Sequence, residues 1–115
     1  MIPFPRSLRP LAGAPGAYAF EVEAEHPAFT GHFPGEPILP GVVQLDWAIR
    51  LGAEAFGGLG AFQSVEHLKF QATIGPREPV ELRLAWDAAA RELGFDYAGP
   101  GGRKSGGFVR FAPPP

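Results

Sequence analysis

Hydrophobic and polar positions along this chain change their period near residue 41. Residues Tyr18–Glu25 alternate, with apolar side chains on one face and glutamates on the other, which predicts a half-buried strand. From Gly41 to Ala55 nearly every position is apolar, and the charged residues Asp46, Arg50 and Glu54 recur every four residues. This spacing predicts an α-helix with one polar stripe. We expect such a helix to be buried on most sides.

The residues after this helix are expected to form strands that close on it. Gly57–Gly60 ends the helix. The remaining predicted strands are Phe62–Thr73, with Val65, Leu68 and Phe70 as candidate inward positions, then Val80–Trp86, Leu93–Tyr97 and Gly107–Phe111. Between them lie a turn over Gly75–Pro79 and a glycine-rich hairpin loop over Gly99–Gly106. Ala88–Leu93 is compatible with a helical turn, but we favour a loop or a bent strand end.

One long helix followed by strands joined through short turns predicts an α+β fold with an antiparallel sheet. The chain has 115 residues, within the usual range of one domain, and its hydrophobic fraction of 45% includes 10 Phe and 2 Trp, enough for a core. We therefore expect a single domain over residues 1–115. Residues 1–16 form an extended arm, and Pro113–Pro115 is a tail that cannot continue a strand.

Composition excludes several classes of protein and site. The net charge is −2 and only 19% of residues are charged, so the basic surface of a nucleic-acid-binding protein is missing. There is no cysteine, which excludes disulfides and thiolate zinc sites. No segment approaches the ~20 apolar residues of a membrane span, and Met1–Pro10 lacks the apolar run of a secretion signal. We expect a cytoplasmic protein.

Proline and glycine are concentrated in the segment that leads into the helix, Gly31–Asp46, and they give it a tight, shaped path. This segment places His32 on a loop, Gly41 at the helix N-terminus and Asp46 in the second helical turn. It resembles the motif of the β-hydroxyacyl-acyl-carrier-protein dehydratases. Eight of the fifteen positions from His32 to Asp46 match in register: His32, Phe33, Pro34, Gly35, Pro37, Pro40, Gly41 and Asp46. The amino-acid sequence of this segment is most similar to that of the small dehydratases of aryl-polyene pigment biosynthesis.

The resemblance implies a hot-dog fold, in which an antiparallel sheet is wrapped around one long central helix. It also implies dehydration of 3-hydroxyacyl-acyl-carrier-protein thioesters to trans-2-enoyl thioesters, in fatty-acid or polyene biosynthesis. A neutral His suits the base that takes a proton beside the thioester carbonyl. A carboxyl group suits the departing hydroxyl, and a helix N-terminus suits the charge on the carbonyl oxygen. His32, Asp46 and Gly41 supply these groups, and no metal or organic cofactor is required.

In the family's dimers the histidine and the acidic residue of one site come from different subunits. By resemblance, we expect a homodimer, or a heterodimer with a paralogous dehydratase, in which His32 of one chain faces Asp46 of its partner. Six apolar residues near the motif are candidate substrate contacts: Phe33, Ile38, Pro40, Val42, Trp47 and Phe70. For Phe33, Trp47 and Phe70, packing in the core is the simpler interpretation.

Arg50 is a departure from the family pattern and a possible modulator of the site, because many relatives carry Gln there. Its charge favours ionised Asp46 if the two side chains touch, which disfavours Asp46 as a proton donor. Either Arg50 points away, or Asp46 accepts a hydrogen bond while His32 handles both proton transfers. The two residues also have the spacing of an ordinary helical ion pair.

Two other functions stay open: a hot-dog thioesterase, and a catalytically silent acyl-binding partner of a paralogous dehydratase. His26 and His67 match no motif and are expected to be structural or solvated. Acyl carrier proteins are acidic, so a docking surface should be basic. The candidate docking residues are Lys69, Arg77, Arg103 and Lys104, the last two on the glycine-rich loop.

Overall fold

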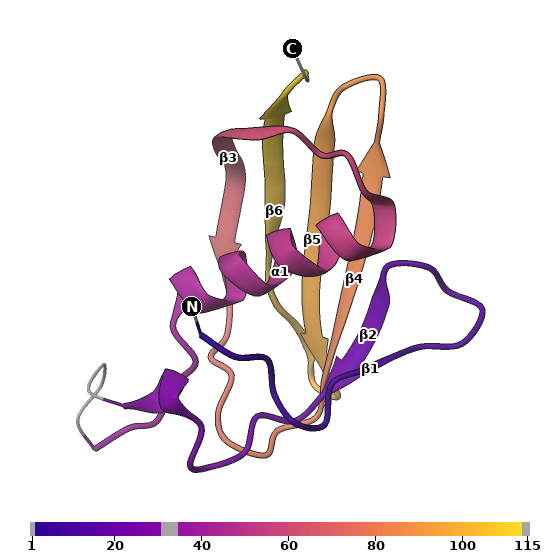
Figure 1. Cartoon of the computed structure of the whole chain (residues 1–115). Helices are drawn as coiled ribbons and strands as arrows, with labels where there is room; N and C mark the ends of the chain where they lie inside the picture. The colour runs from indigo at the N-terminus through magenta and orange to yellow at the C-terminus, as the bar shows by residue number, and fades with distance from the viewer. Residues whose placement is uncertain (1, 31–34, 114–115) are drawn as a thin grey trace.

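The structure is a computed structural model that describes residues 2–30 and 35–113. Within these ranges the chain forms one six-stranded antiparallel sheet with a single long α-helix across one face (Figure 1). The helix, α1, spans Gly41–Phe56, and a short 3-10 turn spans Pro27–Phe29. Along the sheet the strand order is β1 (Arg9–Pro10), β2 (Ala17–Phe20), β4 (Val80–Asp87), β5 (Glu92–Gly99), β6 (Gly102–Ala112) and β3 (Ala61–Phe70). The predicted α+β fold is confirmed.

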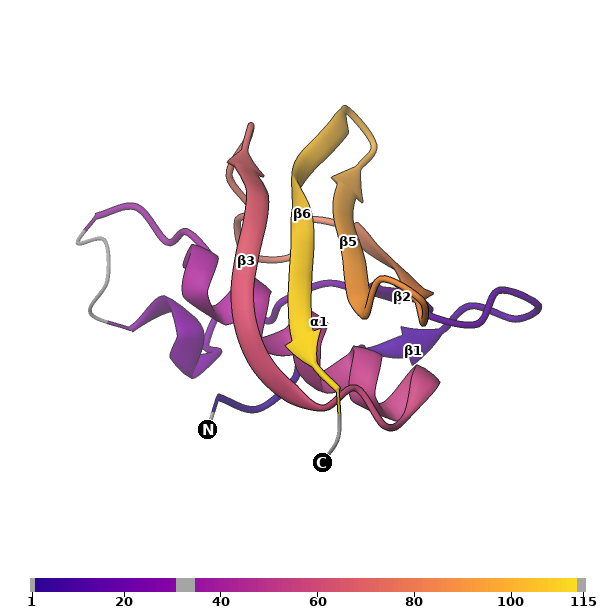
Figure 2. The same cartoon turned by 90° about the horizontal axis from the view of Figure 1, so that it is seen from above.

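Helix α1 packs on the sheet through one stripe of side chains, and the view from above shows it lying to one side of the sheet (Figure 2). The buried residues of this stripe are Val43, Gln44, Trp47, Ala48, Leu51 and Gly52. Gly52 allows a close approach to β5, since a Cβ there would lie 2.6 Å from Leu93 Cδ2. The predicted helix is confirmed, but a single chain buries only part of it: Val42 is 74% exposed.

The core lies between α1 and the three central strands. Val80, Leu82 and Leu84 alternate with exposed residues along β4, as the pattern predicted. The other strands add inward side chains in the same way, and the ring of Phe20 meets the indole of Trp47 edge to face with centroids 5.8 Å apart. This apolar layer holds α1 in a fixed position on the sheet.

The first predicted strand, Tyr18–Glu25, is shorter than expected and ends at Phe20. Phe20 pairs with Val80, the first residue of β4, and the preceding Pro79 has no N–H to continue the ladder. Beyond this point Glu21 pairs with the N-terminal arm instead. The Glu21 N–H donates to the Ser7 hydroxyl (2.8 Å), which donates to the Glu21 carbonyl (2.9 Å).

The prediction that Val65, Leu68 and Phe70 point inward from strand β3 is wrong for two of the three residues. Leu68 and Phe70 are 42% and 51% exposed, and Val65 is half-buried. In the described part of the chain β3 pairs only with β6, so it forms an edge of the sheet. A bulge at His67, whose φ is 55°, also breaks the alternation on which the prediction depended.

The glycine-rich hairpin loop is also shorter than predicted. Gly99 pairs with Gly102, so β6 begins before the charged residues, and Arg103 and Lys104 lie on a strand rather than on an adaptable loop. Residues 88–91 form a turn between β4 and β5, which confirms the loop interpretation there. Among the described helices, none is long and apolar enough to span a membrane.

Candidate functional site

Four of the predicted site residues lie together at the N-terminus of α1: Ile38, Pro40, Gly41 and Phe70. His32 and Phe33 lie outside the described residues. Asp46 and Arg50 project from the second and third turns of α1. Val42 is exposed beside the helix start, whereas Trp47 is 1% exposed and belongs to the core.

The first turn of α1 leaves backbone donors unused. Pro40 is the N-cap residue, with φ −62° and ψ 145°, and no side chain caps the helix. The Val43 and Gln44 N–H groups both donate to the Pro40 carbonyl at 3.1 Å. Within the described ranges, the N–H groups of Gly41 and Val42 have no hydrogen-bond partner. These two donors and the positive end of the helix dipole are suited to a developing negative charge.

An apolar pocket of about 290 Å³ adjoins this helix end. Its size is close to the lower end of the range for small-molecule sites. The ring of Phe70 lies against Gly41, because a Cβ on Gly41 would be 2.5 Å from Phe70 Cζ. The proposed substrate contacts Ile38, Pro40 and Phe70 line the pocket, together with Leu39, Gly41, Gln44, Gln71, Ala72 and Thr73.

Gln44 is a buried polar residue of this pocket that the sequence did not reveal. Its Nε2 donates to the Leu39 carbonyl (3.1 Å), and its Oε1 accepts from the Ser105 hydroxyl (2.6 Å). The Tyr97 hydroxyl donates to the Gln44 carbonyl (2.6 Å). Burial, and secondarily the charge of Asp46, raises the pKa of Tyr97, so the phenol stays a neutral donor. These three hydrogen bonds satisfy Gln44, and those from Tyr97 and Ser105 fix the helix start against the sheet.

Lys104 holds the opposite wall of the pocket. Its Nζ donates to the Thr73 carbonyl (3.0 Å) and pairs with the carboxylate of Glu78. Its own carbonyl accepts from the Gln71 N–H (2.8 Å). Burial opposes ionisation of Glu78, but the Gly75 N–H and Lys104 hold the pKa of this carboxyl below its usual range. Lys104 is therefore engaged inside the protein.

Asp46 and Arg50 form the helical ion pair that their spacing allows. Arg50 Nη1 donates to Asp46 Oδ2 at 3.0 Å, with side-chain exposures of 44% for Asp46 and 23% for Arg50. Arg50 therefore does not point away from Asp46, which excludes the first of the two alternatives for Arg50; the role of Asp46 stays a prediction. A carboxylate held by a guanidinium is suited to accept a hydrogen bond from a substrate hydroxyl.

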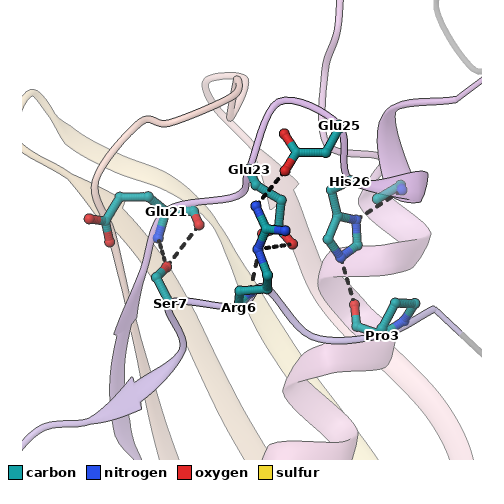
Figure 3. A network of polar contacts seen from close by, with 8 residues as sticks. Pro3, Arg6, Ser7, Glu21, Glu23, Glu25 and His26 are labelled. Atoms are coloured by element: carbon teal, nitrogen blue, oxygen red, sulfur yellow. Dashed lines mark hydrogen bonds and ion pairs between the residues drawn. The ribbon is translucent and has the colours of Figure 1, made fainter.

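The other described histidines do not join this site. His26 is buried, accepts from the Ala28 N–H through Nδ1 (3.0 Å), and its Nε2 lies 2.8 Å from the Pro3 carbonyl (Figure 3). With Nδ1 as an acceptor, Nε2 carries the proton and donates to Pro3. His67 is exposed on the β3 bulge, against the ring of Phe108. In the described parts of the chain, no three His, Cys, Asp or Glu side chains gather as metal ligands would.

A family model described as "ApeI-like: ApeI dehydratase" matches residues 15–107. The chain belongs to the ApeI-like dehydratase family. It is also similar to curated 3-hydroxyacyl-[acyl-carrier-protein] dehydratases named FabZ. The protein from Alkaliphilus metalliredigens is 33% identical over 89 residues, which cover 71% of this chain and 60% of that protein. The protein from Latilactobacillus sakei is 30% identical over 100 residues, covering 78% and 71%. The chain thus spans about 60% of the length of the first of these relatives.

Solved structures agree with the hot-dog fold of an ApeI-like dehydratase. A chain of the dehydratase heterocomplex ApeI:P from Xenorhabdus doucetiae superposes with a TM-score of 0.78 at 28% identity, covering 96% of this chain and 97% of that one. An uncharacterised protein from Erwinia carotovora subsp. atroseptica gives a TM-score of 0.78 at 30% identity, covering 98% of each chain. Both neighbours cover nearly the whole chain.

The described residues at the start of α1 combine three chemical features. The N–H groups of Gly41 and Val42, which have no partner within the described ranges, can stabilise an oxygen that gains negative charge. The carboxylate of Asp46, one turn further along the helix, can accept a hydrogen bond. The apolar pocket at the first turn is suited to hydrocarbon.

Proposed function

We propose that this ApeI-like dehydratase removes water from 3-hydroxyacyl thioesters of acyl carrier protein, in fatty-acid or aryl-polyene-like biosynthesis. The observation that carries the proposal is the start of α1. There the N–H groups of Gly41 and Val42 have no partner within the described residues, and an apolar pocket adjoins the first turn. Asp46 follows on the second turn, half-exposed and bonded to Arg50. The match of the segment from His32 to Asp46 to the dehydratase motif adds the base.

In the proposed reaction, all proton transfers and charge stabilisation come from groups of the protein. His32 takes the proton from the carbon beside the thioester carbonyl, and the Gly41 N–H stabilises the charge on the carbonyl oxygen. The electron pair then forms the carbon–carbon double bond as the carbon–oxygen bond at position 3 breaks. Asp46 accepts a hydrogen bond from the hydroxyl and orients it, while the proton on His32 passes to the departing oxygen and makes water. No metal or organic cofactor takes part.

We propose that the working unit is a homodimer, with His32 and Asp46 of each site on different subunits. Exposed apolar side chains support an interface. Leu68 and Phe70 lie on the unpaired edge strand β3, and Val42 is 74% exposed. Edge strands with exposed apolar residues are natural sites of pairing. The alternative is a heterodimer with a paralogous dehydratase, and the similarity to a chain of the dehydratase heterocomplex ApeI:P supports considering it.

The catalytically silent partner is a second candidate function, and two observations favour it. Arg50 donates to one oxygen of Asp46, at a position where many family members carry Gln. A neighbour in structure is a chain of the dehydratase heterocomplex ApeI:P. A silent subunit would bind the acyl chain in its pocket but form no enoyl product when supplied alone.

The docking surface for an acidic carrier protein is proposed to include Lys69 and Arg77. Both are exposed and make no ion pair within the described residues, whereas Arg103 is paired with Asp96 and Lys104 with Glu78. Lys69→Glu with Arg77→Glu should weaken turnover of the carrier-bound substrate, and the loss should fade as salt rises. Turnover of the small N-acetylcysteamine thioester should be unchanged. Equal loss on both substrates would exclude docking as the cause.

The function itself is tested with 3-hydroxyacyl-carrier proteins of several chain lengths, followed by mass spectrometry. Loss of one water is expected with the unaltered chain, and His32→Ala should lower the rate at least about 10²-fold. Release of free acid instead of loss of water would indicate the thioesterase. No conversion by the chain alone, with conversion restored by a paralogous dehydratase, would indicate the silent partner.

A further inference from the structure

We infer that the N-terminal arm, residues Ile2–Ser7, belongs to the site and acts as a positioning element for Asp46, through Arg50. The inference rests on the proposed function, since it assigns a role to the orientation of Asp46. It goes further by including a segment that lies outside the matched dehydratase motif, whose Ile2 lies 44 positions before Asp46 in the sequence. Arg50 is then a positioning residue and not a catalytic one.

Arg50 makes three contacts, and the arm supplies two of them. Its Nη1 donates to the Ile2 carbonyl at 2.7 Å and to Asp46 Oδ2 at 3.0 Å. Its guanidinium carbon lies 4.1 Å from the centroid of the Phe4 ring. A planar guanidinium stacks well on an aromatic face while its edge donates hydrogen bonds. The arm therefore fixes the plane and the direction of the group that holds Asp46.

The arm is itself anchored to the fold next to these contacts. Trp47 Nε1 donates to the Ile2 carbonyl (3.4 Å), so Arg50 and Trp47 share one acceptor. His26 Nε2 donates to the Pro3 carbonyl (2.8 Å), and this buried imidazole packs edge to face on Trp47.

Further along the arm, Arg6 pairs with Glu23 and Glu25 (Figure 3). Ser7 bonds both backbone groups of Glu21. The arm is thus bonded to the fold at both ends, and the Ile2 carbonyl keeps a defined position.

This arrangement leaves one carboxylate oxygen of Asp46 available. Oδ2 accepts from Arg50, whereas Oδ1 has no hydrogen bond within the described ranges. A long side chain such as Arg50 has many rotamers in water. Without the Phe4 ring and the Ile2 carbonyl it would sample them, and Asp46 would lose its orientation. The proposed hydroxyl contact needs that orientation, because misplaced groups lose rate steeply.

A double-mutant cycle on purified full-length protein tests this route from the arm to Asp46. Phe4→Leu removes the ring but keeps an apolar side chain, and it should lower kcat about fivefold with KM nearly unchanged. Arg50→Met, which removes every donor but keeps a long side chain, should lower kcat by at least as much. In the Arg50→Met background Phe4→Leu should have no further effect, since the ring acts only through the guanidinium. Phe4→Tyr keeps the ring and should retain the unaltered rate.

Phe56→Leu is the matched control. Phe56 is a half-buried phenylalanine at the far end of α1, and its replacement should leave kcat unchanged. Thermal unfolding of each variant shows that the compared proteins are folded. The same fivefold loss for Phe4→Leu in both backgrounds, or an unchanged kcat for Phe4→Leu alone, would overturn the inference while the proposed function stands. An unaltered chain that forms no enoyl product would overturn both.

Discussion

The two ends of helix α1 are built in opposite ways. At the C-terminal end the Gly57 N–H donates to the Ala53 carbonyl (2.9 Å), and Gly52 packs tightly against the buried side chain of Leu93. At the N-terminal end Pro40 provides no side-chain cap, and the Gly41 N–H is unpaired within the described residues. One end is closed by packing and hydrogen bonds, whereas the other leaves donors available to a ligand.

The glycines near the two ends of α1, Gly41 and Gly52, have different structural roles. Gly52 allows the helix to approach β5, and its neighbour Leu93 is fully buried and cannot move away. Gly41 is covered by the ring of Phe70, which is 51% exposed and has room to move. A side chain added at Gly52 should therefore damage the fold, while one added at Gly41 should damage the site.

The largest effect is expected at Asp46. Asp46→Ala should lower dehydration at least about 10²-fold, because the oriented hydroxyl contact is lost. The side chain is 44% exposed, so the unfolding temperature should change little. The control is Glu54→Ala, on the same polar stripe but near the closed end of the helix. A similar loss of activity in both variants would remove the distinction between the two ends.

The closed end should respond to Gly52→Val with a loss of stability. The new side chain would overlap Leu93, and overpacking of this kind costs about 1–3 kcal/mol. Urea unfolding measures the change, and kcat of the folded fraction should stay near the unaltered value. An unchanged midpoint of unfolding would mean that the helix and β5 have more room than the structure shows.

Gly41→Ala is expected to have the reverse pattern. The added methyl group would push Phe70 and shift the pocket beside the free N–H groups, so activity should fall about tenfold. Stability should hold, since α1 accepts alanine and Phe70 is partly exposed. The added change Phe70→Leu should restore part of the rate. Equal activity of Gly41→Ala and the unaltered chain would show that the helix end is not used.

A smaller, pH-dependent effect is expected at Glu78, which supports the pocket wall. Its pKa is held below the ordinary value of 4.5, so ionised Glu78 stabilises the fold above that pH, and this contribution is lost as the pH falls through the lower folded value. Glu78→Gln should therefore cost about 1 kcal/mol at neutral pH. The cost should shrink on acidification. A constant difference between the two proteins from neutral to acid pH would contradict this.

Local patterns predicted the elements that are buried on one face. The helix was predicted over Gly41–Ala55 and found over Gly41–Phe56, and the alternation of Val80–Trp86 gave β4 directly. The edge strand was predicted less well. The bulge at His67 changes its period. Leu68 and Phe70 stay largely exposed, although the Phe70 ring touches Gly41 at the start of α1.

Contacts between distant residues explain what the sequence did not predict at the site. Tyr97 reaches the Gln44 carbonyl across 53 positions, and Ser105 reaches the Gln44 side chain across 61. Arg50 meets the Ile2 carbonyl across 48 positions. No local period encodes such pairs. The Asp46–Arg50 pair, four residues apart on one helix, was one of the alternatives open from the sequence, because helical geometry can bring the two side chains together.

The central claim is that the open end of α1 is an active site completed by the partner subunit, and subunit mixing tests it most directly. His32→Ala and Asp46→Ala should each be inactive alone. After verified subunit exchange, half of the mixed protein should be heterodimers at random association, and each heterodimer should contain one intact site. Recovery of about a quarter of the unaltered activity is therefore expected. No recovery despite exchange would contradict a site shared between subunits.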